Sequence, residues 1–164
     1  MDYQLGWLKK PDIEEALKIE WYTAQNFWNK SDFEKIFTIS NLRCVVPLVC
    51  RLEVKPRYNF LAGYCIYKHT KDSYNILNMV VHPEYRRMGV GTLFIKNLLF
   101  KTKKGDRKFI RIRIRDSEES HSAKKFLRSM HFTLDGIVPE FYNQYDKFGN
   151  IIGKEDAIEY YIAT

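Results

Sequence analysis

Cysteine is scarce in this sequence, and long apolar runs are missing from it. The three cysteines, Cys44, Cys50 and Cys65, are odd in number and show no C-x-x-C spacing. They predict buried, reduced thiols and exclude a disulfide framework. No segment approaches the ~18 continuous apolar residues of a membrane-spanning helix, and residues 1–10 lack the apolar core of a signal peptide. We therefore expect a cytoplasmic protein with no membrane partner.

Metal-ligand patterns are also lacking. The histidines, His69, His82, His121 and His131, show no H-E-x-x-H spacing and are not accompanied by a Cys/His cluster. We therefore expect no metal.

The composition does supply a core and a positive charge. With 164 residues, 45% of them hydrophobic, the chain is about the size of one domain, and we expect a single domain over residues 1–164. The 27 Lys and Arg against 20 Asp and Glu give a formal charge of +7. Such a surface attracts anions, which could belong to nucleic acid, acidic protein or a phosphorylated cofactor.

Two capping-box spacings, Asp12 with Glu15 and Ser31 with Glu34, predict two helices before any strand. In the first helix, apolar residues recur at helical spacing and are expected to form its buried face. They are Ile13, Ala16, Leu17, Trp21 and Ala24.

Apolar patterns predict the remaining elements. In chain order they are strands at 44–54, 60–68 and 74–81, a helix through 93–99, a strand at 109–115, a helix through 123–130, and strands at 132–138 and 157–162. The last two strands are separated by an expected long loop at 139–156. The order ααβββαβαββ predicts an α/β or α+β fold in which helices flank one sheet.

The connection after residues 74–81 carries the clearest chemical signal. Arg86, Gly89 and Gly91 form an R-x-x-G-x-G run between a strand and a helix. Glycines allow close approach of a ligand, and N–H groups at a helix N-terminus form an anion nest. The alternative is a tight turn that needs glycine for steric reasons alone. The two adjacent arginines, Arg86 and Arg87, favour the interpretation that phosphate binds here.

The stretch from Asn78 to Thr92 resembles the acetyl-CoA motif of the GNAT superfamily of N-acetyltransferases. The resemblance implies a GNAT-like, mixed and mostly antiparallel sheet, with acetyl-CoA as the acyl donor. It also implies a pantetheine site along the strand and a pyrophosphate site in the loop, with Arg86 beside them. The residues are Met79, Val80 and Val81 for the pantetheine, and Arg87, Met88, Gly89, Val90, Gly91 and Thr92 for the pyrophosphate.

The C-terminal half resembles the ribosomal-protein alanine N-acetyltransferases and related protein N-terminal acetyltransferases. Residues 120–132 are similar to that family's N-x-x-A-x-x-F-Y-x-x-x-G-F pattern, and residues 140–142 and 155–158 to its paired aromatics and final E-D-A strand. This resemblance implies acetyl transfer to a protein N-terminal α-amine. Ser120 stands where the family usually has Asn, and its hydroxyl can still hydrogen-bond the cofactor.

Two departures concern the catalytic residues. Leu127 stands where the family often has the Tyr that acts as general acid, and Arg115 where a Glu or His is common. Thioester aminolysis needs a proton donor and a base. We expect Tyr142 as the donor, with aromatic packing as its alternative role. We expect Asp116 as the base, ahead of Glu118 and Glu119, which precede a helix whose dipole favours carboxylates in any case.

Other functions remain open at this point. A small-molecule amine acetyltransferase would need a deeper, acidic pocket, and the missing tyrosine leaves room for a catalytically inactive CoA-binding protein. The alternating arginines of residues 109–115 could bind nucleic acid, but no aromatic residue is interleaved with them after Phe109, so we expect no nucleic-acid partner. A monomer and a homodimer are both compatible with the sequence.

Overall fold

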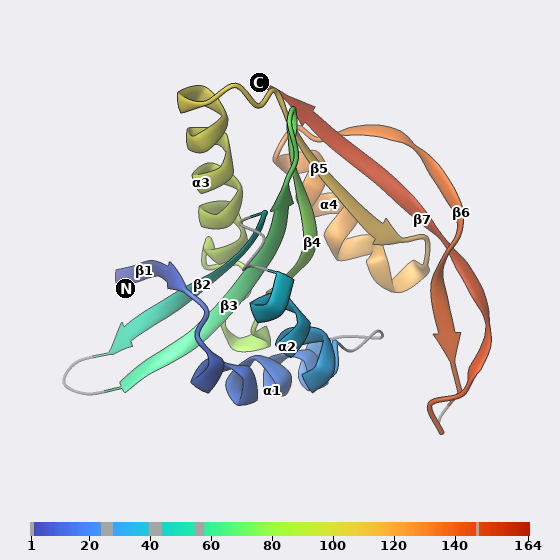
Figure 1. The fold of residues 1–164 in the computed structure, drawn as a ribbon, viewed down its shortest axis with the longest axis horizontal. Coiled ribbons are helices and arrows are strands. Elements are labelled where there is room, and N and C mark those ends of the chain that lie inside the picture. The colour runs from blue at the N-terminus through green and yellow to red at the C-terminus, as the bar shows by residue number, and fades with distance from the viewer. Residues whose placement is uncertain (1, 24–27, 40–43, 55–57, 147) are drawn as a thin grey trace.

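The computed structural model describes residues 2–23, 28–39, 44–54, 58–146 and 148–164. These residues form one seven-stranded sheet in the order β1-β2-β3-β4-β5-β7-β6 (Figure 1). Neighbouring strands are antiparallel except β4 and β5, which are parallel. The strands are β1 (Asp2–Trp7), β2 (Val45–Val54), β3 (Tyr58–His69), β4 (Ser73–Val81), β5 (Phe109–Arg115), β6 (Thr133–Tyr145) and β7 (Ile151–Ala163).

Helices cover both faces of the sheet. The α-helices are α1 (Ile13–Thr23), α2 (Lys30–Ile39), α3 (Val90–Lys104) and α4 (His121–Ser129), with short 3-10 helices η1 (Lys10–Asp12), η3 (Pro83–Tyr85) and η4 (Glu118–Ser120). One core cluster joins α1 and α2 to the sheet, and a separate cluster joins α3 and α4 to it. Within the described residues, none of the helices combines the length and apolar character required to cross a membrane.

The predicted fold class is confirmed, because the sheet is mixed, mostly antiparallel and flanked by helices. Two details of the predicted order are wrong. A strand, β1, precedes the helices and pairs with β2. Residues 139–156 are not a long loop, since β6 and β7 continue through them as a paired hairpin. Register shifts and a positive φ of 49° at Glu140 interrupt the strands there. Apolar and polar residues therefore do not alternate regularly, and the sequence does not show the usual pattern of a strand.

The buried face of α1 also differs from the expected one. Ile13 and Ala16 are buried as predicted, but Ile19 and Glu20 complete the face, whereas Trp21 is 77% exposed. Ala24 lies outside the described residues. The helix is therefore rotated relative to the predicted stripe, and the carboxylate of Glu20, 1% exposed, lies in the core.

The central pair of strands separates part of the way along its length. β4 and β5 pair from Ser73 opposite Phe109 to Ile76 opposite Ile112, and then diverge (Figure 1). β4 stays paired with β3 as far as Val81, and β5 stays paired with β7. From residue 77 onward, the edge of β4 that faces β5 has no partner strand among the described residues.

The close approach of β3 and β4 depends on Gly63. A Cβ atom added there would lie 2.6 Å from the carbonyl oxygen of Val80, a backbone atom that cannot move aside. We expect Gly63→Ala to lower the free energy of unfolding by about 1–3 kcal/mol, measured by urea denaturation. Gly6→Ala is the control, because its Cβ would make an ordinary 3.8 Å contact with Val49. Equal midpoints for Gly63→Ala and the parent protein would contradict this account.

Candidate functional site

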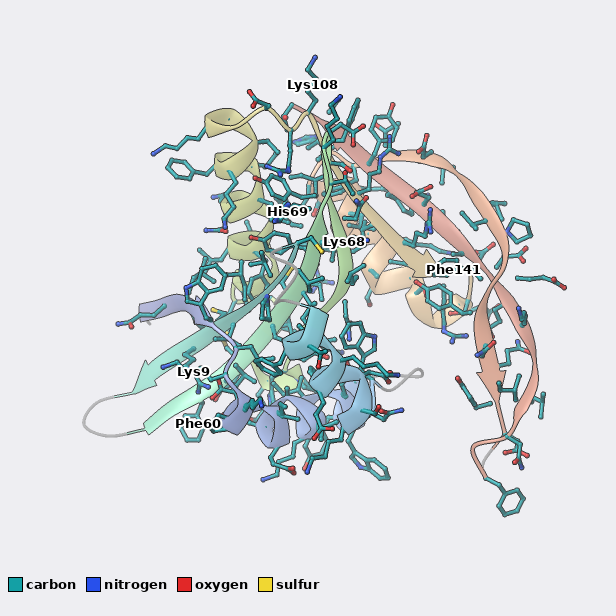
Figure 2. All side chains as sticks on the ribbon, in the orientation of Figure 1. Lys9, Phe60, Lys68, His69, Lys108 and Phe141 are labelled. Carbon is teal, nitrogen blue, oxygen red and sulfur yellow. The ribbon has the colours of Figure 1, made fainter. Side chains whose placement is uncertain are left out.

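A cavity of about 630 Å³ opens where β4 and β5 diverge. Aromatic side chains and two arginines form much of its wall, and its described lining contains no carboxylate. Phe141, labelled in Figure 2, lies against Arg113, with the guanidinium carbon 4.9 Å from the ring centroid. The lining residues are Thr23, Trp28, Ile76, Leu77, Asn78, Met79, Ile112, Arg113, Ile114, Arg115, Ser120, Ala123, Phe141, Tyr142, Asn143 and Tyr145. Of the predicted site residues, the structure thus brings Met79, Ser120 and Tyr142 together.

The connection from β4 to α3 has the backbone shape of an anion site. Arg87 and Gly89 have φ values of 63° and 88°, and such left-handed residues turn successive N–H groups toward one point. Gly89 is the N-cap of α3 and no side chain caps the helix. Leu93 donates to the Gly89 carbonyl oxygen at 2.9 Å, so the N–H groups of residues 90–92 have no acceptor within the helix. They are available to an anion.

The two glycines of this loop serve different purposes. A Cβ atom on Gly89 would meet nothing within 4 Å, so the loop is open at that residue. A Cβ atom on Gly91 would lie 3.1 Å from the ring of Phe126 on α4. The steric interpretation of the glycine pair therefore holds for Gly91, whose small size lets α3 and α4 pack together.

Two side chains near this loop form hydrogen bonds with the backbone. Arg86 is exposed, and its Nε donates to the Val81 carbonyl oxygen at 3.4 Å. His82 Nδ1 accepts a hydrogen bond from the backbone N–H of Glu84 at 3.3 Å, which caps η3. The other guanidinium nitrogens of Arg86 have no partner among the described residues.

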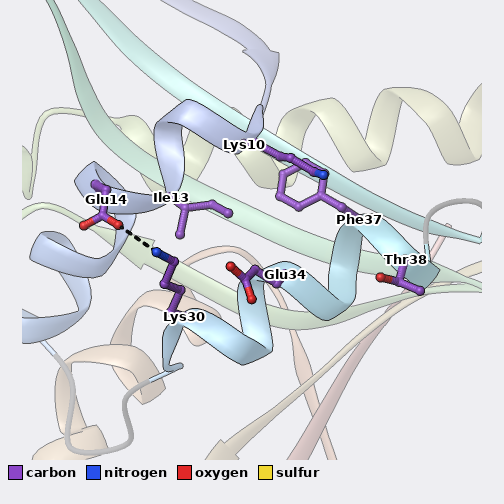
Figure 3. Close-up of a pocket in the computed structure, with 7 residues that line it drawn as sticks. All are labelled: Lys10, Ile13, Glu14, Lys30, Glu34, Phe37 and Thr38. Atoms are coloured by element: carbon purple, nitrogen blue, oxygen red, sulfur yellow. Dashed lines mark ion pairs between the residues drawn. The ribbon is translucent and has the colours of Figure 1, made fainter.

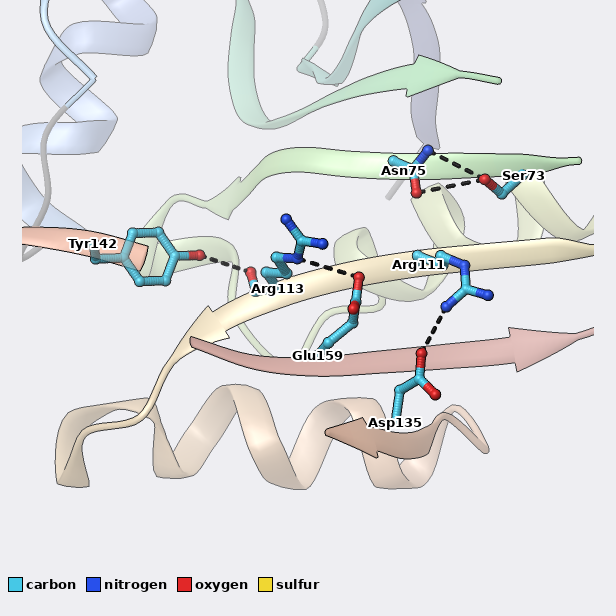
Figure 4. Close-up of polar contacts among 7 residues, drawn as sticks. All are labelled: Ser73, Asn75, Arg111, Arg113, Asp135, Tyr142 and Glu159. Carbon is cyan, nitrogen blue, oxygen red and sulfur yellow. Dashed lines mark hydrogen bonds and ion pairs between the residues drawn. The ribbon is translucent and has the colours of Figure 1, made fainter. Parts of the chain in front are cut away.

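Tyr142 reaches the cavity from β6. Its hydroxyl donates to the carbonyl oxygen of Arg113 at 3.0 Å (Figure 4). Burial raises the pKa of the Tyr142 phenol, and the charges of Arg115 and Arg113 oppose this effect. The phenol is therefore protonated at neutral pH, as a proton donor must be.

Asp116 lies at the end of β5 and is absent from the described lining of the cavity. Its Oδ1 accepts a hydrogen bond from Lys124 Nζ at 2.9 Å. The structure therefore brings Tyr142, but not Asp116, to the cavity. The side chain of Glu119 lies outside the described residues.

Leu127 and Arg115, the two departures noted in the sequence, both contact other elements of the fold. Leu127 is 1% exposed in the core that joins α3 and α4 to the sheet. Arg115 forms an ion pair with Glu155 on β7 and donates to the carbonyl oxygen of Asn143 at 2.7 Å. Arg115 thereby ties β5 to the β6–β7 hairpin.

The arginine face of β5 is largely neutralised. Arg111 pairs with Asp135 at 2.7 Å, and Arg113 pairs with Glu159 at 3.2 Å (Figure 4). With the Arg115–Glu155 pair, every arginine of this face has an acid of β6 or β7 beside it. The excess of positive charge that nucleic acid would need is therefore not concentrated on this strand.

Sequence reasoning missed a buried polar group behind the cavity. Glu20 Oε1 accepts hydrogen bonds from the Tyr64 hydroxyl and, at 2.7 Å, from Asn78 Nδ2. Its Oε2 accepts from the backbone N–H of Trp28 at 3.4 Å. Burial raises the pKa of Glu20, and the hydrogen bonds from Tyr64 and Asn78 partly offset that increase. The available signal was a carboxylate four residues after Ala16, at helical spacing on the apolar face.

Another cavity, of about 640 Å³, lies between α1 and α2 (Figure 3). Side chains of both charges line it, and Lys30 pairs with Glu14 there at 3.5 Å. None of its described lining residues belongs to β4, β5 or the glycine loop. It therefore lies against neither the anion nest nor the free edge of β4.

Comparison with known proteins identifies this arrangement. Residues 48–134 match the family model of the acetyltransferase (GNAT) domain. The matched segment runs from β2 into β6 and includes the glycine loop and both strands that flank the cavity. No curated protein sequence matches the chain at a significant level.

Solved structures share the fold over nearly the whole chain. The ribosomal-protein-S18-alanine N-acetyltransferase of Escherichia coli is 20% identical, with a TM-score of 0.73 over 99% of this chain and 94% of that one. Ard1 from Thermoplasma volcanium is 14% identical, with a TM-score of 0.79 over 100% and 99%. Arabidopsis thaliana NAA60 in complex with acetyl-CoA is 14% identical, with a TM-score of 0.75 over 99% and 98%.

The surroundings of Glu20 generate a stability prediction. Tyr64→Phe removes a donor to a buried carboxylate, so we expect it to lower the free energy of unfolding by about 1–3 kcal/mol. Because the lost hydrogen bond lowers the pKa of Glu20, the variant raises that pKa further. A raised carboxyl pKa in the folded state weakens stability as pH rises through it. The cost is therefore larger at neutral pH than at mildly acidic pH.

The control for this prediction is Tyr67→Phe. Tyr67 is equally buried on β3, but its hydroxyl accepts from Lys101 Nζ at 2.8 Å and contacts no carboxylate in the described residues. Its cost should not change over the same acidic range in urea unfolding. A pH-independent cost for Tyr64→Phe would show that Glu20 does not depend on this hydrogen bond.

Proposed function

The chain belongs to the GNAT family of acetyltransferases, and we propose that it transfers the acetyl group of acetyl-CoA to the N-terminal α-amine of a protein. Its class, N-acetyltransferase, follows from the family; the donor and the acceptor are the proposal. The observation that carries it is the divergence of β4 and β5, which opens a cavity along an unpaired strand edge that leads into the anion nest. We further propose that residues 1–164 act as one domain.

The donor site is proposed along β4 and the glycine loop. Pantetheine is an amide chain, so it can pair with the free edge of β4 at Met79, Val80 and Val81 as a strand would. The pyrophosphate would accept hydrogen bonds from the N–H groups of residues 87–92, with Arg86 contributing positive charge. Ser120 lines the opposite wall and would bind the pantetheine through its hydroxyl.

The charge and the aromatic walls of the cavity favour a peptide as the acceptor. Its described lining has no carboxylate, and its two arginines are already paired with acids of β7, so a polycationic small molecule would find no partner for its charges there. Its aromatic walls, among them Trp28 and Tyr145, suit the apolar and backbone groups of a peptide. An α-amine, with a pKa near 8, is partly neutral at physiological pH, whereas a lysine amine, with a pKa near 10.4, needs a stronger base. A site with few acid and base groups therefore favours the α-amine.

In the reaction the amine nitrogen attacks the thioester carbonyl carbon, a new C–N bond forms, and the C–S bond breaks. A backbone N–H on the free edge of β4 would stabilise the carbonyl oxygen as its negative charge develops. Tyr142 would give its proton to the departing thiolate. Asp116, through water, would receive the proton that the amine loses.

Two further observations support the proposal. The Escherichia coli neighbour is named for an alanine of ribosomal protein S18, and the Arabidopsis thaliana neighbour was solved with acetyl-CoA. Cys44, Cys50 and Cys65 are all unpaired, which fits a reducing compartment, so we propose that the protein acts in the cytoplasm.

A peptide-pool assay tests the proposed function. The pool is randomised at its first two residues, carries one internal lysine, and is supplied with free and with blocked N-termini. We expect acetyl transfer to the free N-termini only. Acetylation confined to lysine would overturn the acceptor class. Stabilisation by acetyl-CoA without thiol release from any amine would instead identify an inactive CoA-binding protein.

The anion nest is tested by Gly89→Glu. The substitution places a negative side chain where the pyrophosphate would bind, so we expect acetyl-CoA affinity to fall at least about tenfold, or ~1.4 kcal/mol, by calorimetry. Gly149→Glu is a matched control. Its φ is +84° against +88° for Gly89, and a Cβ atom at either position meets nothing within 4 Å. Equal acetyl-CoA affinities in the two variants would show that the pyrophosphate does not bind at this loop.

The proton-transfer residues are tested by Tyr142→Phe and Asp116→Asn. We expect each to lower the acetylation rate at least about tenfold, below the ~10²–10⁴ of a fully committed acid or base because water substitutes for either group. Tyr145→Phe is the control, because it removes another hydroxyl from the cavity wall. It should leave the acetylation rate within about twofold of the parent protein, the variation expected of a neutral substitution. Full activity in the double variant would remove both residues from the mechanism.

A further inference from the structure

Glu20, Tyr64 and Asn78 form a hydrogen-bonded group, here called the Glu20 cluster, that the proposed reaction does not use. Glu20 comes from α1, Tyr64 from β3 and Asn78 from β4. Glu20 is 1% exposed, and none of the ion pairs in the described part of the chain includes it. Asn78 belongs also to the lining of the cavity. The cluster therefore connects a buried carboxylate to the cavity wall.

Glu20 determines which way the amide of Asn78 is turned. Asn78 Nδ2 donates to Glu20 Oε1 at 2.7 Å and to the Tyr64 hydroxyl oxygen at 3.2 Å. The opposite orientation would place the amide oxygen against the carboxylate, and two acceptors without a proton between them repel each other. The amide nitrogen therefore faces the core, and Asn78 Oδ1 is left without a hydrogen-bond donor among the described side chains.

We propose that Asn78 Oδ1 binds an N–H of the acceptor amine and that Glu20 is the positioning residue that keeps this oxygen turned to the cavity. The inference rests on the proposed function. Asn78 immediately precedes Met79, which is proposed to hold the pantetheine, so an amine at Asn78 lies beside the thioester. An acceptor at this place binds an N–H and leaves the nitrogen lone pair free. A donor would instead compete for that lone pair.

The burial of Glu20 supports a role beyond packing. An ionised carboxylate without a cationic partner is costly to bury, and an apolar side chain of similar volume would fill the same space with less loss of stability. The carboxylate differs from such a side chain in accepting several hydrogen bonds at once. Here these bonds fix the amide of a residue in the cavity wall.

An exchange of donor and acceptor tests this inference. Asn78→Asp alone opposes two carboxylates, so we expect kcat/KM for the preferred peptide of the pool to fall at least about tenfold, mainly through KM. Adding Glu20→Gln supplies an amide donor to the new carboxylate, while the outer oxygen still faces the cavity. The double variant keeps the size and net charge of the parent protein. We expect it to recover most of the lost kcat/KM.

Two further variants complete the test. Asn78→Ala removes the oxygen altogether, so kcat/KM should fall as in Asn78→Asp and should not recover when Glu20→Gln is added. Glu14→Gln makes the same change of charge on the exposed side of α1 and should leave peptide kinetics unchanged. Thermal stabilisation by acetyl-CoA, equal in all variants, shows that each is folded and that the donor site is intact.

Peptide binding separates this inference from the proposed function. Calorimetric titration of the peptide pool into the CoA-bound protein needs no turnover, and affinities should follow the same order as kcat/KM. Parent-like peptide binding by Asn78→Ala, or a double variant no better than Asn78→Asp, would overturn the inference. A parent protein that binds the peptides in this way but acetylates none would overturn the proposed function and leave the role of the Glu20 cluster standing.

Discussion

The separation of β4 from β5 determines where this fold leaves backbone groups open to a ligand. Parallel neighbours cannot be joined by a tight turn, so the chain crosses from β4 to β5 through α3. The N-terminus of α3 consequently lies at the end of β4, where the two strands have already parted. One topological requirement thus places an anion nest at the end of a free strand edge, and a cavity along that edge. Ligands of open α/β sheets generally bind at such carboxyl ends of strands.

Each of the two diverging strands is held on its other side. β3 holds the other edge of β4, and β7 holds the other edge of β5. The arginines of β5 are engaged by acids of β6 and β7, so their charges stabilise the hairpin that forms one wall of the cavity. On the opposite wall, the Glu20 cluster ties α1 to β3 and β4. Each wall of the cavity therefore has its own hydrogen bonds and ion pairs.

Local patterns in the sequence were sufficient to predict the parts of the fold that repeat regularly. The glycine loop could be located because glycine is typical of backbone positions that other residues rarely adopt. Gly89 has such a conformation, with a positive φ. The extension of β6 and β7 could not be predicted, since register shifts break its alternation. The rotation of α1 could not be predicted either, because Trp21 is as apolar as a core residue and yet faces solvent. The burial of Glu20 was missed for the same reason, because the predicted apolar face was turned away from it.

The candidate catalytic groups were harder to predict than the glycine loop, because their surroundings depend on contacts between segments that lie far apart in the sequence. β6 pairs with β7 and not with β5, yet the Tyr142 side chain reaches the carbonyl oxygen of Arg113 on β5 and lines the cavity, a contact that no local pattern encodes. Asp116 is close in sequence to the strands that flank the cavity, but its carboxylate is bonded to Lys124 on α4. Its proposed role in proton transfer therefore requires an intervening water.

A crystal structure of the protein with acetyl-CoA would show directly whether the donor binds along β4 and the glycine loop. The account predicts the pyrophosphate against the N–H groups of residues 87–92, with the pantetheine paired to β4 at residues 79–81 and the thioester beside Asn78. Acetyl-CoA bound elsewhere, for example in the cavity between α1 and α2, would contradict it. So would a complex in which β4 and β5 had closed on each other.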